Sequence, residues 1–265
     1  MNLNLKDKVI IVTGGAKGIG KGISKVLAAE GAIVAIIGRN EKDNIEMVNE
    51  IIAAGGNAFQ VMAELTYPEQ CKNAVQLVAE KYQRIDGVVN NAGVNDGVNL
   101  EDGNYEKFME SLHKNVVHYY LVAHHALPYL KKSTAAAIVN ISSKTAETGQ
   151  GGTSAYAAAN GGRNALTREW AVELLKYSIR VNAVIVAECY TPLYEMWLQK
   201  LPDPAAKLTA IKELIPLENR MTTAEEIANM VAFLLSDKSS HTTGQLIYVD
   251  GGYTHLDRAV GAINK

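Results

Sequence analysis

The chain has little of what several protein classes require. Only two cysteines occur in 265 residues, and Cys71 and Cys189 lie far apart without metal-ligand spacing, which favours reduced structural thiols over a disulfide or a zinc site. No apolar run is long enough to cross a bilayer, and residues 1–8 contain no hydrophobic signal core. No block of lysine and arginine occurs, and the formal net charge is −2. We therefore expect a cytoplasmic protein with no nucleic-acid or membrane partner.

Histidine is present, but not in a pattern that binds metal. No histidine has a cysteine or a carboxylate at ligand spacing, and the adjacent His124 and His125 would point about 100° apart on a helix. We therefore predict that the chain holds no metal ion. The six histidines are His113, His118, His124, His125, His241 and His255.

The chain is rich enough in apolar residues to bury one large core. Apolar residues make up 48% and charged residues 20%, so we expect a single domain over residues 1–265. Short β-branched runs alternate with longer helical patterns, which predicts a doubly wound, Rossmann-type α/β fold with a parallel seven-stranded sheet. The expected strands are Val9–Thr13, Ala32–Ile37, Asn57–Met62, Gly87–Asn90, Ala137–Ile141, Arg180–Val184 and Leu246–Val249.

Three helices have signals at their ends. Pro68 is placed to open a helix that runs to Tyr82, since proline suits the first helical turn. Thr223 and Glu226 have the spacing of a capping box for a helix that runs to Leu235. A third helical pattern begins near Tyr156 and runs to about residue 176.

A glycine-rich turn follows the first expected strand. Gly14, Gly18 and Gly20, with Ile19 between the last two, precede a run with helical spacing. Glycine permits a tight turn and a close approach to the backbone, and the free N–H groups at a helix start favour a pyrophosphate. Glycines alone could mark only a turn, but the strand before them and the helix after them favour a nucleotide-binding loop.

The residues after the second and third expected strands bear on the choice of nucleotide. Gly38 occupies the place where a fold that selects NAD usually has an acidic residue, and Lys17 and Arg39 are cations near it. NADP is therefore favoured over NAD, although both cations could be ordinary surface charges. Glu64 and Leu65 could touch the adenine edge, or could form a plain strand-to-helix turn.

Hydroxyl and amide side chains follow the fourth and fifth expected strands. The fourth ends in Asn90 and continues as Asn91-Ala92-Gly93, where ligands meet the carboxyl ends of such a sheet. The fifth leads into Ser143, and Tyr156 stands 13 residues further on, at the start of a helix. A serine hydroxyl and a phenol placed in this way can hold one substrate oxygen and exchange its proton.

Together these motifs resemble those of the short-chain dehydrogenase/reductase family, over almost the whole chain. The resemblance implies NAD(P)-dependent hydride transfer, a catalytic Ser143 and Tyr156, and Asn115 holding a water relay. It also implies that Thr191 meets the nicotinamide carboxamide and that the Asn91-Ala92-Gly93 loop lies under the cofactor. Within the family, Thr191-Pro192-Leu193-Tyr194 and the segment 241–258 are similar to the L-fucose dehydrogenase branch, which oxidises a sugar's anomeric hydroxyl to a lactone.

Two positions depart from the family pattern. The family places lysine four residues after the tyrosine, where it lowers the pKa of the phenol and binds the nicotinamide ribose, but here Asn160 stands in that place. Asparagine keeps a hydrogen bond and brings no charge, so we expect slow dehydrogenation at neutral pH. Arg163 could supply a substitute cation, but its place further along the helix predicts a surface position. Val186-Ala187 replaces the family's Pro-Gly, which leaves cofactor affinity less certain.

The expected substrate pocket is polar. Asn95, Glu147, Gln150 and Glu188 could bind a polyhydroxylated ligand, although each could equally be a solvated loop position. Residues 188–219, interrupted by four prolines, are predicted to form a substrate lid. The alternatives are a family member that acts on another alcohol or ketone, a non-catalytic nucleotide-binding relative, and an Asn160 introduced to trap a complex. The resemblance also implies a homodimer or homotetramer.

Overall fold

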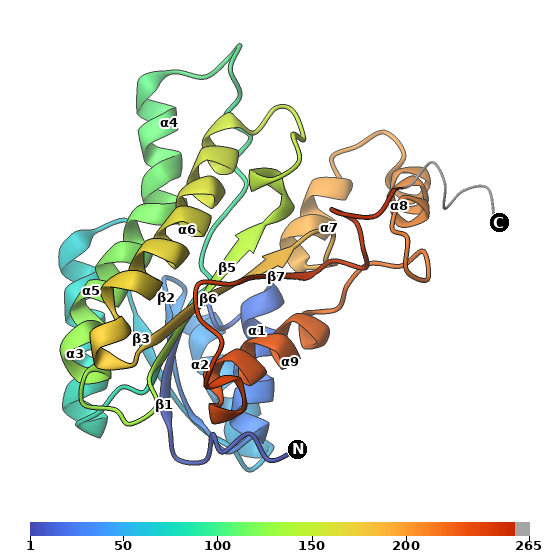
Figure 1. Ribbon diagram of the computed structural model, residues 1–265. Helices are drawn as coiled ribbons and strands as arrows, with labels where there is room; N and C mark the ends of the chain where they lie inside the picture. Colours follow the sequence, from blue (N-terminus) through green and yellow to red (C-terminus); the bar gives the residue numbers. More distant parts are fainter. Residues whose placement is uncertain (258–265) are drawn as a thin grey trace.

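One parallel sheet of seven strands forms the centre of the molecule (Figure 1). The structure is a computed structural model, and residues 1–257 are described here. The strand order is β3-β2-β1-β4-β5-β6-β7, so the chain reverses direction across the sheet after β3. The strands are β1 Val9–Thr13, β2 Ile33–Gly38, β3 Asn57–Met62, β4 Gly87–Asn90, β5 Ala137–Ser143, β6 Arg180–Val186 and β7 Leu246–Val249.

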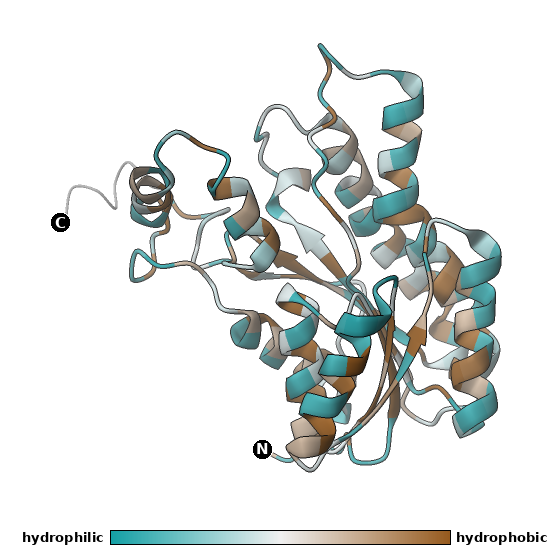
Figure 2. Cartoon of the chain, turned by 180° about the vertical axis from the view of Figure 1, so that it is seen from behind, coloured by the Kyte–Doolittle hydropathy of each residue, from teal (hydrophilic) through white to brown (hydrophobic). Residues whose placement is uncertain are grey.

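Helices cover both faces of the sheet, as the pattern predicts. Alternate residues of β1 point to opposite faces, so Val9 and Ile11 belong to one apolar cluster, and Ile10 and Val12 to the other. The first cluster lies under α3 Pro68–Tyr82, α5 His118–Leu130 and α6 Ser154–Glu173, and the second under α1 Gly18–Ala29, α2 Glu41–Ala53 and α9 Ala224–Leu235. Figure 2 shows the hydrophobic residues gathered on the strands and on the helix faces that meet them.

The sequence pattern predicts the strand bounds well, with one informative difference. Both β5 and β6 run two residues beyond their predicted ends, because Ser142 and Ser143 pair in register with Ile185 and Val186. Strand pairing depends on the backbone, so the two polar serines do not end the ladder. Ser143 is therefore the last residue of a buried strand and is held rigidly.

The expected helix signals are also confirmed. The helix α3 begins at Pro68 and ends at Tyr82. Thr223 Oγ1 accepts from the N–H of Glu226 at 3.2 Å, and Glu226 Oε2 accepts from the N–H of Thr223 at 2.8 Å, which completes the capping box of α9. The helix α6 ends at Glu173, about three residues before its predicted end, and a short 3₁₀ turn follows.

The segment between β6 and α9 forms two short helices, α7 Pro192–Leu198 and α8 Pro204–Glu213. Each begins at a proline behind a capping side chain: Thr191 Oγ1 accepts from the N–H of Tyr194, and Asp203 Oδ1 from that of Ala206. In Figure 1 both helices lie beyond the end of β6, the edge where the predicted site lies. No helix of the described chain is long and apolar enough to cross a membrane.

Candidate functional site

The turn between β1 and α1 has the geometry of a nucleotide-binding loop. Gly14 and Gly18 have φ angles of 63° and 54°, a region that side chains disfavour. A Cβ on Gly20 would lie 2.1 Å from the carbonyl oxygen of Gly14, so only glycine fits there. The helix α1 begins at Gly18 with no acidic residue in its first turn, which favours an anion at its N-terminus. Ile19 packs against the apolar cluster below and anchors the turn.

Asparagine and threonine side chains lock this turn to the end of β4. Asn91 Nδ2 donates to the carbonyl oxygen of Thr13 at 2.9 Å, and Thr13 Oγ1 accepts from the N–H groups of Asn91 and Ala92 at 2.9 and 3.1 Å. On the opposite side, a Cβ on Gly18 would lie 3.3 Å from the methyl group of Thr191. The predicted cofactor residues from three distant parts of the sequence therefore lie together.

The two cations predicted near the adenosine both have acidic partners. Lys17 Nζ lies 2.7 Å from Asp43 Oδ2, and Arg39 Nη1 lies 3.6 Å from Glu64 Oε2. Both cation side chains are exposed, Lys17 by 63% and Arg39 by 76%, and Leu65 beside them is buried. Ion pairs this exposed contribute little to stability, so an anionic ligand could displace either carboxylate at low cost.

The predicted catalytic residues come from β5 and from α6, a helix that packs against β5 and β6. Ser143 is buried and its Oγ accepts from the N–H of Thr145 at 3.3 Å. Ser142 Oγ donates to the carbonyl oxygen of Asn160 at 3.4 Å, which joins the end of β5 to the helix that carries Tyr156. Tyr156 itself is half-buried.

Asn160 does not face solvent or an open pocket. It is fully buried, and its Nδ2 donates to the carbonyl oxygen of Tyr156 at 2.8 Å, one turn back on the helix. Its Oδ1 accepts from Arg163 Nη1 at 2.9 Å. The amide thus joins the backbone of Tyr156 to the head of Arg163.

The predicted surface position of Arg163 is wrong. The side chain is 3% exposed, and its guanidinium carbon lies 4.3 Å from the ring centroid of Tyr119 and 6.0 Å from that of Tyr156. Its Nε donates to the carbonyl oxygen of Asn115 at 2.6 Å, and its Nη1 to that of Ile141 at 3.2 Å. The acceptors come from other elements, so spacing along one helix could not reveal them.

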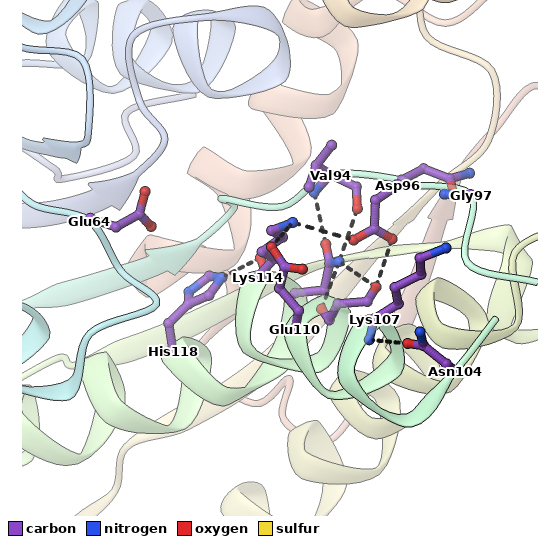
Figure 3. Close-up of polar contacts among 12 residues, drawn as sticks. Glu64, Val94, Asp96, Gly97, Asn104, Lys107, Glu110, Lys114 and His118 are labelled. Carbon is purple, nitrogen blue, oxygen red and sulfur yellow. Dashed lines mark hydrogen bonds and ion pairs between the residues drawn. The ribbon is translucent and has the colours of Figure 1, made fainter.

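Asn115 lies in a π-helical turn, His113–Val117, between α4 Tyr105–Leu112 and α5. Its Oδ1 accepts from the N–H of Val94 at 2.8 Å, and its Nδ2 donates to the carbonyl oxygens of Val94 and Ser111, both at 2.9 Å. Figure 3 shows the polar network on the outer side of this turn, where Lys114 lies between Asp96 and Glu110. Asn115 thus holds the loop after β4 in place, and π turns often occur at functional sites.

Two buried titratable groups lie beside Arg163. Burial, with a smaller effect of Arg163, lowers the pKa of His118 to about 3, so this imidazole is neutral at neutral pH. Burial raises the pKa of Tyr119, whose hydroxyl donates to the carbonyl oxygen of Ile141 at 3.1 Å. Neither side chain carries a charge in the physiological range.

Among the predicted substrate residues, Glu188 belongs to a buried polar cluster. It pairs with Lys144 and accepts from the hydroxyl of Tyr194 at 2.8 Å. Burial and the nearby Glu188 raise the pKa of Tyr194. Lys144 Nζ also lies 3.8 Å from the ring centroid of Tyr253. The sequence analysis did not predict a role for Lys144. Its place directly after Ser143, at the carboxyl end of a strand where ligands bind in such folds, could have indicated one.

The other predicted substrate residues do not join this cluster. Glu147 Oε1 accepts from Asn164 Nδ2 at 2.8 Å, so this carboxylate is held by α6. Asn95 and Gln150 are exposed, and Asn95 Oδ1 accepts from the N–H of Gly97 at 3.3 Å. A cavity of about 410 Å³ lies elsewhere, around Arg220, Tyr248 and Leu256, and is not lined by Ser143 or Tyr156.

The two thiols form no disulfide, and the described residues form no metal site. Both cysteines are free and buried, and burial raises the pKa of Cys71 to about 11 and that of Cys189 to about 12. Within residues 1–257, no group of three or more histidine, cysteine, aspartate or glutamate side chains could hold a metal ion.

Comparisons with known proteins match nearly the whole chain. A family model described as enoyl-(acyl carrier protein) reductase matches residues 14–254. A 3-oxoacyl-[acyl-carrier-protein] reductase of Thermotoga maritima is 38% identical over 94% of this chain and 99% of its own length. The L-fucose dehydrogenase of Bos taurus is 32% identical over 98% and 95%. The crystal structure of the Cj0485 dehydrogenase matches with a TM-score of 0.91 and 45% identity, over 98% of both chains.

Proposed function

Because this chain belongs to the short-chain dehydrogenase/reductase family of NAD(P)-dependent oxidoreductases, we propose that it oxidises a sugar hydroxyl, converting L-fucose or a related aldose to its lactone. The observation that supports the proposal is the hydrogen bond from Ser142 Oγ to the carbonyl oxygen of Asn160, which joins the end of β5, with Ser143, to the helix that carries Tyr156. Both elements belong to the half of the fold next to the glycine turn. A hydroxyl and a phenol so placed suit proton exchange with an alcohol.

The residues around the turn fit a dinucleotide. The left-handed Gly14 and Gly18, and the close approach of Gly20 to the carbonyl oxygen of Gly14, shape a tight turn whose backbone suits a pyrophosphate at the N-terminus of α1. Bound NAD(P)+ would accept the hydride. The remaining binding residues would be Lys17, Ile19, Arg39, Glu64, Leu65, Asn91, Ala92, Gly93, Tyr156 and Thr191. The amide of the buried Asn160, expected to bind the ribose, is instead bonded to Tyr156 and Arg163.

Each catalytic residue has one task in this proposal. Ser143 donates a hydrogen bond that holds the substrate oxygen, and Tyr156 takes the hydroxyl proton as the C–H bond breaks. Asn115 fixes the loop after β4 through its bonds to Val94, which keeps the floor of the site in place.

The polar cluster of Lys144, Glu188 and Tyr194 supports a sugar as substrate. Charged and hydroxyl side chains next to Ser143 offer both donors and acceptors, which an aldose needs and a hydrocarbon substrate does not. Asn95, Glu147 and Gln150 would add contacts at the rim, under a lid formed by residues 188–219. The similarity to L-fucose dehydrogenase also supports a sugar substrate. The similarity to a 3-oxoacyl-[acyl-carrier-protein] reductase makes reduction of a 3-oxoacyl thioester the main alternative.

We propose NADP as the preferred cofactor. Gly38 places no carboxylate at the end of β2, and Lys17 and Arg39 lie near it. An added phosphate would compete with Asp43 and Glu64 for these two cations, so the preference is expected to be modest.

We also propose a homodimer or homotetramer. Tyr105, Tyr120 and Val172, on α4, α5 and α6, are 73%, 50% and 68% exposed. Apolar side chains on three neighbouring helices suit contact with a second copy of the chain.

The test is initial-rate reduction of NAD+ and NADP+ with L-fucose, other aldoses and a simple secondary alcohol, together with NADPH oxidation by a 3-oxoacyl thioester. We expect turnover with one or more aldoses, a lactone as product, and a kcat/KM for NADP+ about threefold to tenfold above that for NAD+. A preference of about 100-fold or more for the thioester would overturn the sugar assignment. Cofactor binding without turnover of any substrate would support the non-catalytic alternative.

A further inference from the structure

Arg163 is a buried cation without an acidic partner. None of the carboxylates in residues 1–257 pairs with it, and its acceptors are the backbone oxygens of Asn115 and Ile141 and the side-chain oxygens of Asn160 and Asn115. An unpaired buried charge disfavours folding unless hydrogen bonds compensate for its loss of hydration. An apolar side chain of similar volume would fill such a site without that desolvation cost. A buried charge of this kind is a candidate for a role in chemistry.

The space for the guanidinium is made by several elements. A Cβ on Gly93, in the loop after β4, would lie 2.7 Å from Arg163 Nη2 and 2.9 Å from Asn115 Oδ1. The π turn of residues 113–117 presents the Asn115 carbonyl oxygen to Arg163 Nε. The predicted cofactor loop, the π turn and α6 therefore meet at one positively charged group.

Arg163 is a charged group that lies close to the ring of Tyr156. Tyr119 and His118 of α5 pack beside it, and both are neutral near pH 7. Lys144, next to Ser143, pairs with Glu188. Asn160 and Asn115 are uncharged. Arg163 is therefore a buried cation whose guanidinium carbon lies 6.0 Å from the ring centroid of Tyr156.

We infer that Arg163 supplies the positive charge that favours the ionised form of Tyr156, and that Asn160 is a positioning residue that holds Arg163 for this purpose. This inference rests on the proposed function of Tyr156 as the proton acceptor. Asn160 Oδ1 receives Nη1 while Asn160 Nδ2 holds the Tyr156 carbonyl oxygen, so one amide sets the distance between the cation and the helix turn that carries the phenol.

The first test is the pH dependence of kcat for the natural protein and for Arg163→Gln, which removes the charge and keeps an amide. We expect kcat at pH 7 to fall at least tenfold and the pH of half-maximal rate to rise by at least one unit, with rates converging near pH 10. Arg163→Lys should keep the half-maximal pH close to its natural value. The matched control is Arg168→Gln, an exposed arginine on the same helix, which should change neither.

A second readout needs neither substrate nor cofactor. Tyrosinate absorbance is recorded against pH for the natural protein and for each Arg163 variant, and again for each of them with Tyr156→Phe added. The difference between the two curves is the ionisation of Tyr156 alone, without the other 11 of the 12 tyrosines. We expect the midpoint to rise by at least one pH unit in Arg163→Gln. The double variant Asn160→Lys with Arg163→Gln moves the charge by one helix turn and should restore the midpoint. Arg163→Met, which also removes the charge but keeps an apolar side chain of similar length, should raise the midpoint as Arg163→Gln does, so the test stands if Arg163→Gln folds poorly.

The outcomes separate the two proposals. An unchanged midpoint in Arg163→Gln, or in Arg163→Met if the first variant folds poorly, would assign Arg163 a purely structural role and overturn the inference. If the natural protein oxidises no alcohol, the proposed function fails, and the absorbance titration still decides whether Arg163 acts on Tyr156.

Discussion

Replacing Tyr156 with phenylalanine is expected to lower kcat by roughly 10² to 10⁴-fold, the usual contribution of a general acid or base. The substitution removes the proton acceptor and little else, because no hydrogen bond of the phenol to the described chain supports the fold, while the bond from Asn160 goes to the backbone. The Kd for NAD(P)+ should stay within about threefold, and the melting temperature should change little. Initial rates, cofactor fluorescence and thermal unfolding measure the three quantities.

The matched control is Tyr177→Phe, which changes a partly exposed tyrosine in the turn after α6. It should leave kcat unchanged. Tyr156→Phe with more than about a third of the natural kcat at every pH would show that another group accepts the proton, and the assignment of Tyr156 would then be wrong.

The second large effect is expected from Gly20→Ala. The added methyl group would lie 2.1 Å from the Gly14 oxygen and 2.6 Å from Asn91 Nδ2, so the glycine turn and its bond to β4 must shift. We expect cofactor affinity to fall at least 100-fold, since the pyrophosphate site is formed by this backbone. The free energy of unfolding should fall by about 1–3 kcal/mol, the usual cost of overpacking. Isothermal titration with NADP+ and denaturant unfolding would measure both.

Gly161→Ala is the control for this substitution. Gly161 lies inside α6 and has open space where a Cβ would be, so alanine should fit and should raise stability by roughly 0.5–1 kcal/mol through its helix propensity. Cofactor affinity should not change. If Gly20→Ala bound NADP+ as tightly as the Gly161→Ala protein, the glycine turn would not be the pyrophosphate site.

Local signals were sufficient for most of the fold. The strands follow from short β-branched runs such as Val9–Thr13, and α9 follows from the capping pair of Thr223 and Glu226. These signals act over a few residues and depend on backbone geometry, so they can be read from the sequence. The ends of β5 and β6 were missed because their pairing depends on the neighbouring strand rather than on side-chain type.

The charges of the candidate site could not be predicted in the same way. Charged residues are mostly exposed, so a surface position was the natural expectation for Arg163. Its burial depends on acceptors from Asn115 and Ile141, 48 and 22 residues away. The pairing of Lys144 with Glu188 spans 44 residues in the same way. Such contacts exist only after the helices and strands have packed.

The position of Arg163 also changes the expectation for Asn160. Slow turnover at neutral pH was predicted on the premise that no cation lies near the phenol, and the structure contradicts that premise. A lysine at position 160 would lack the oxygen that accepts from Arg163 Nη1 at 2.9 Å and would place two cations together in a buried site. Asparagine at position 160 is therefore a better partner than lysine for an arginine at position 163.

The most direct measurement compares the turnover of the natural protein with that of Asn160→Lys from pH 7 to pH 10, using the best alcohol of the substrate panel with NADP+ and NAD+. We predict that the natural protein already turns over well at pH 7 and that the lysine brings no gain and lowers the melting temperature. A natural protein that is nearly inactive at pH 7, with turnover raised tenfold or more by the lysine, would contradict the role of Arg163 as the charge beside Tyr156.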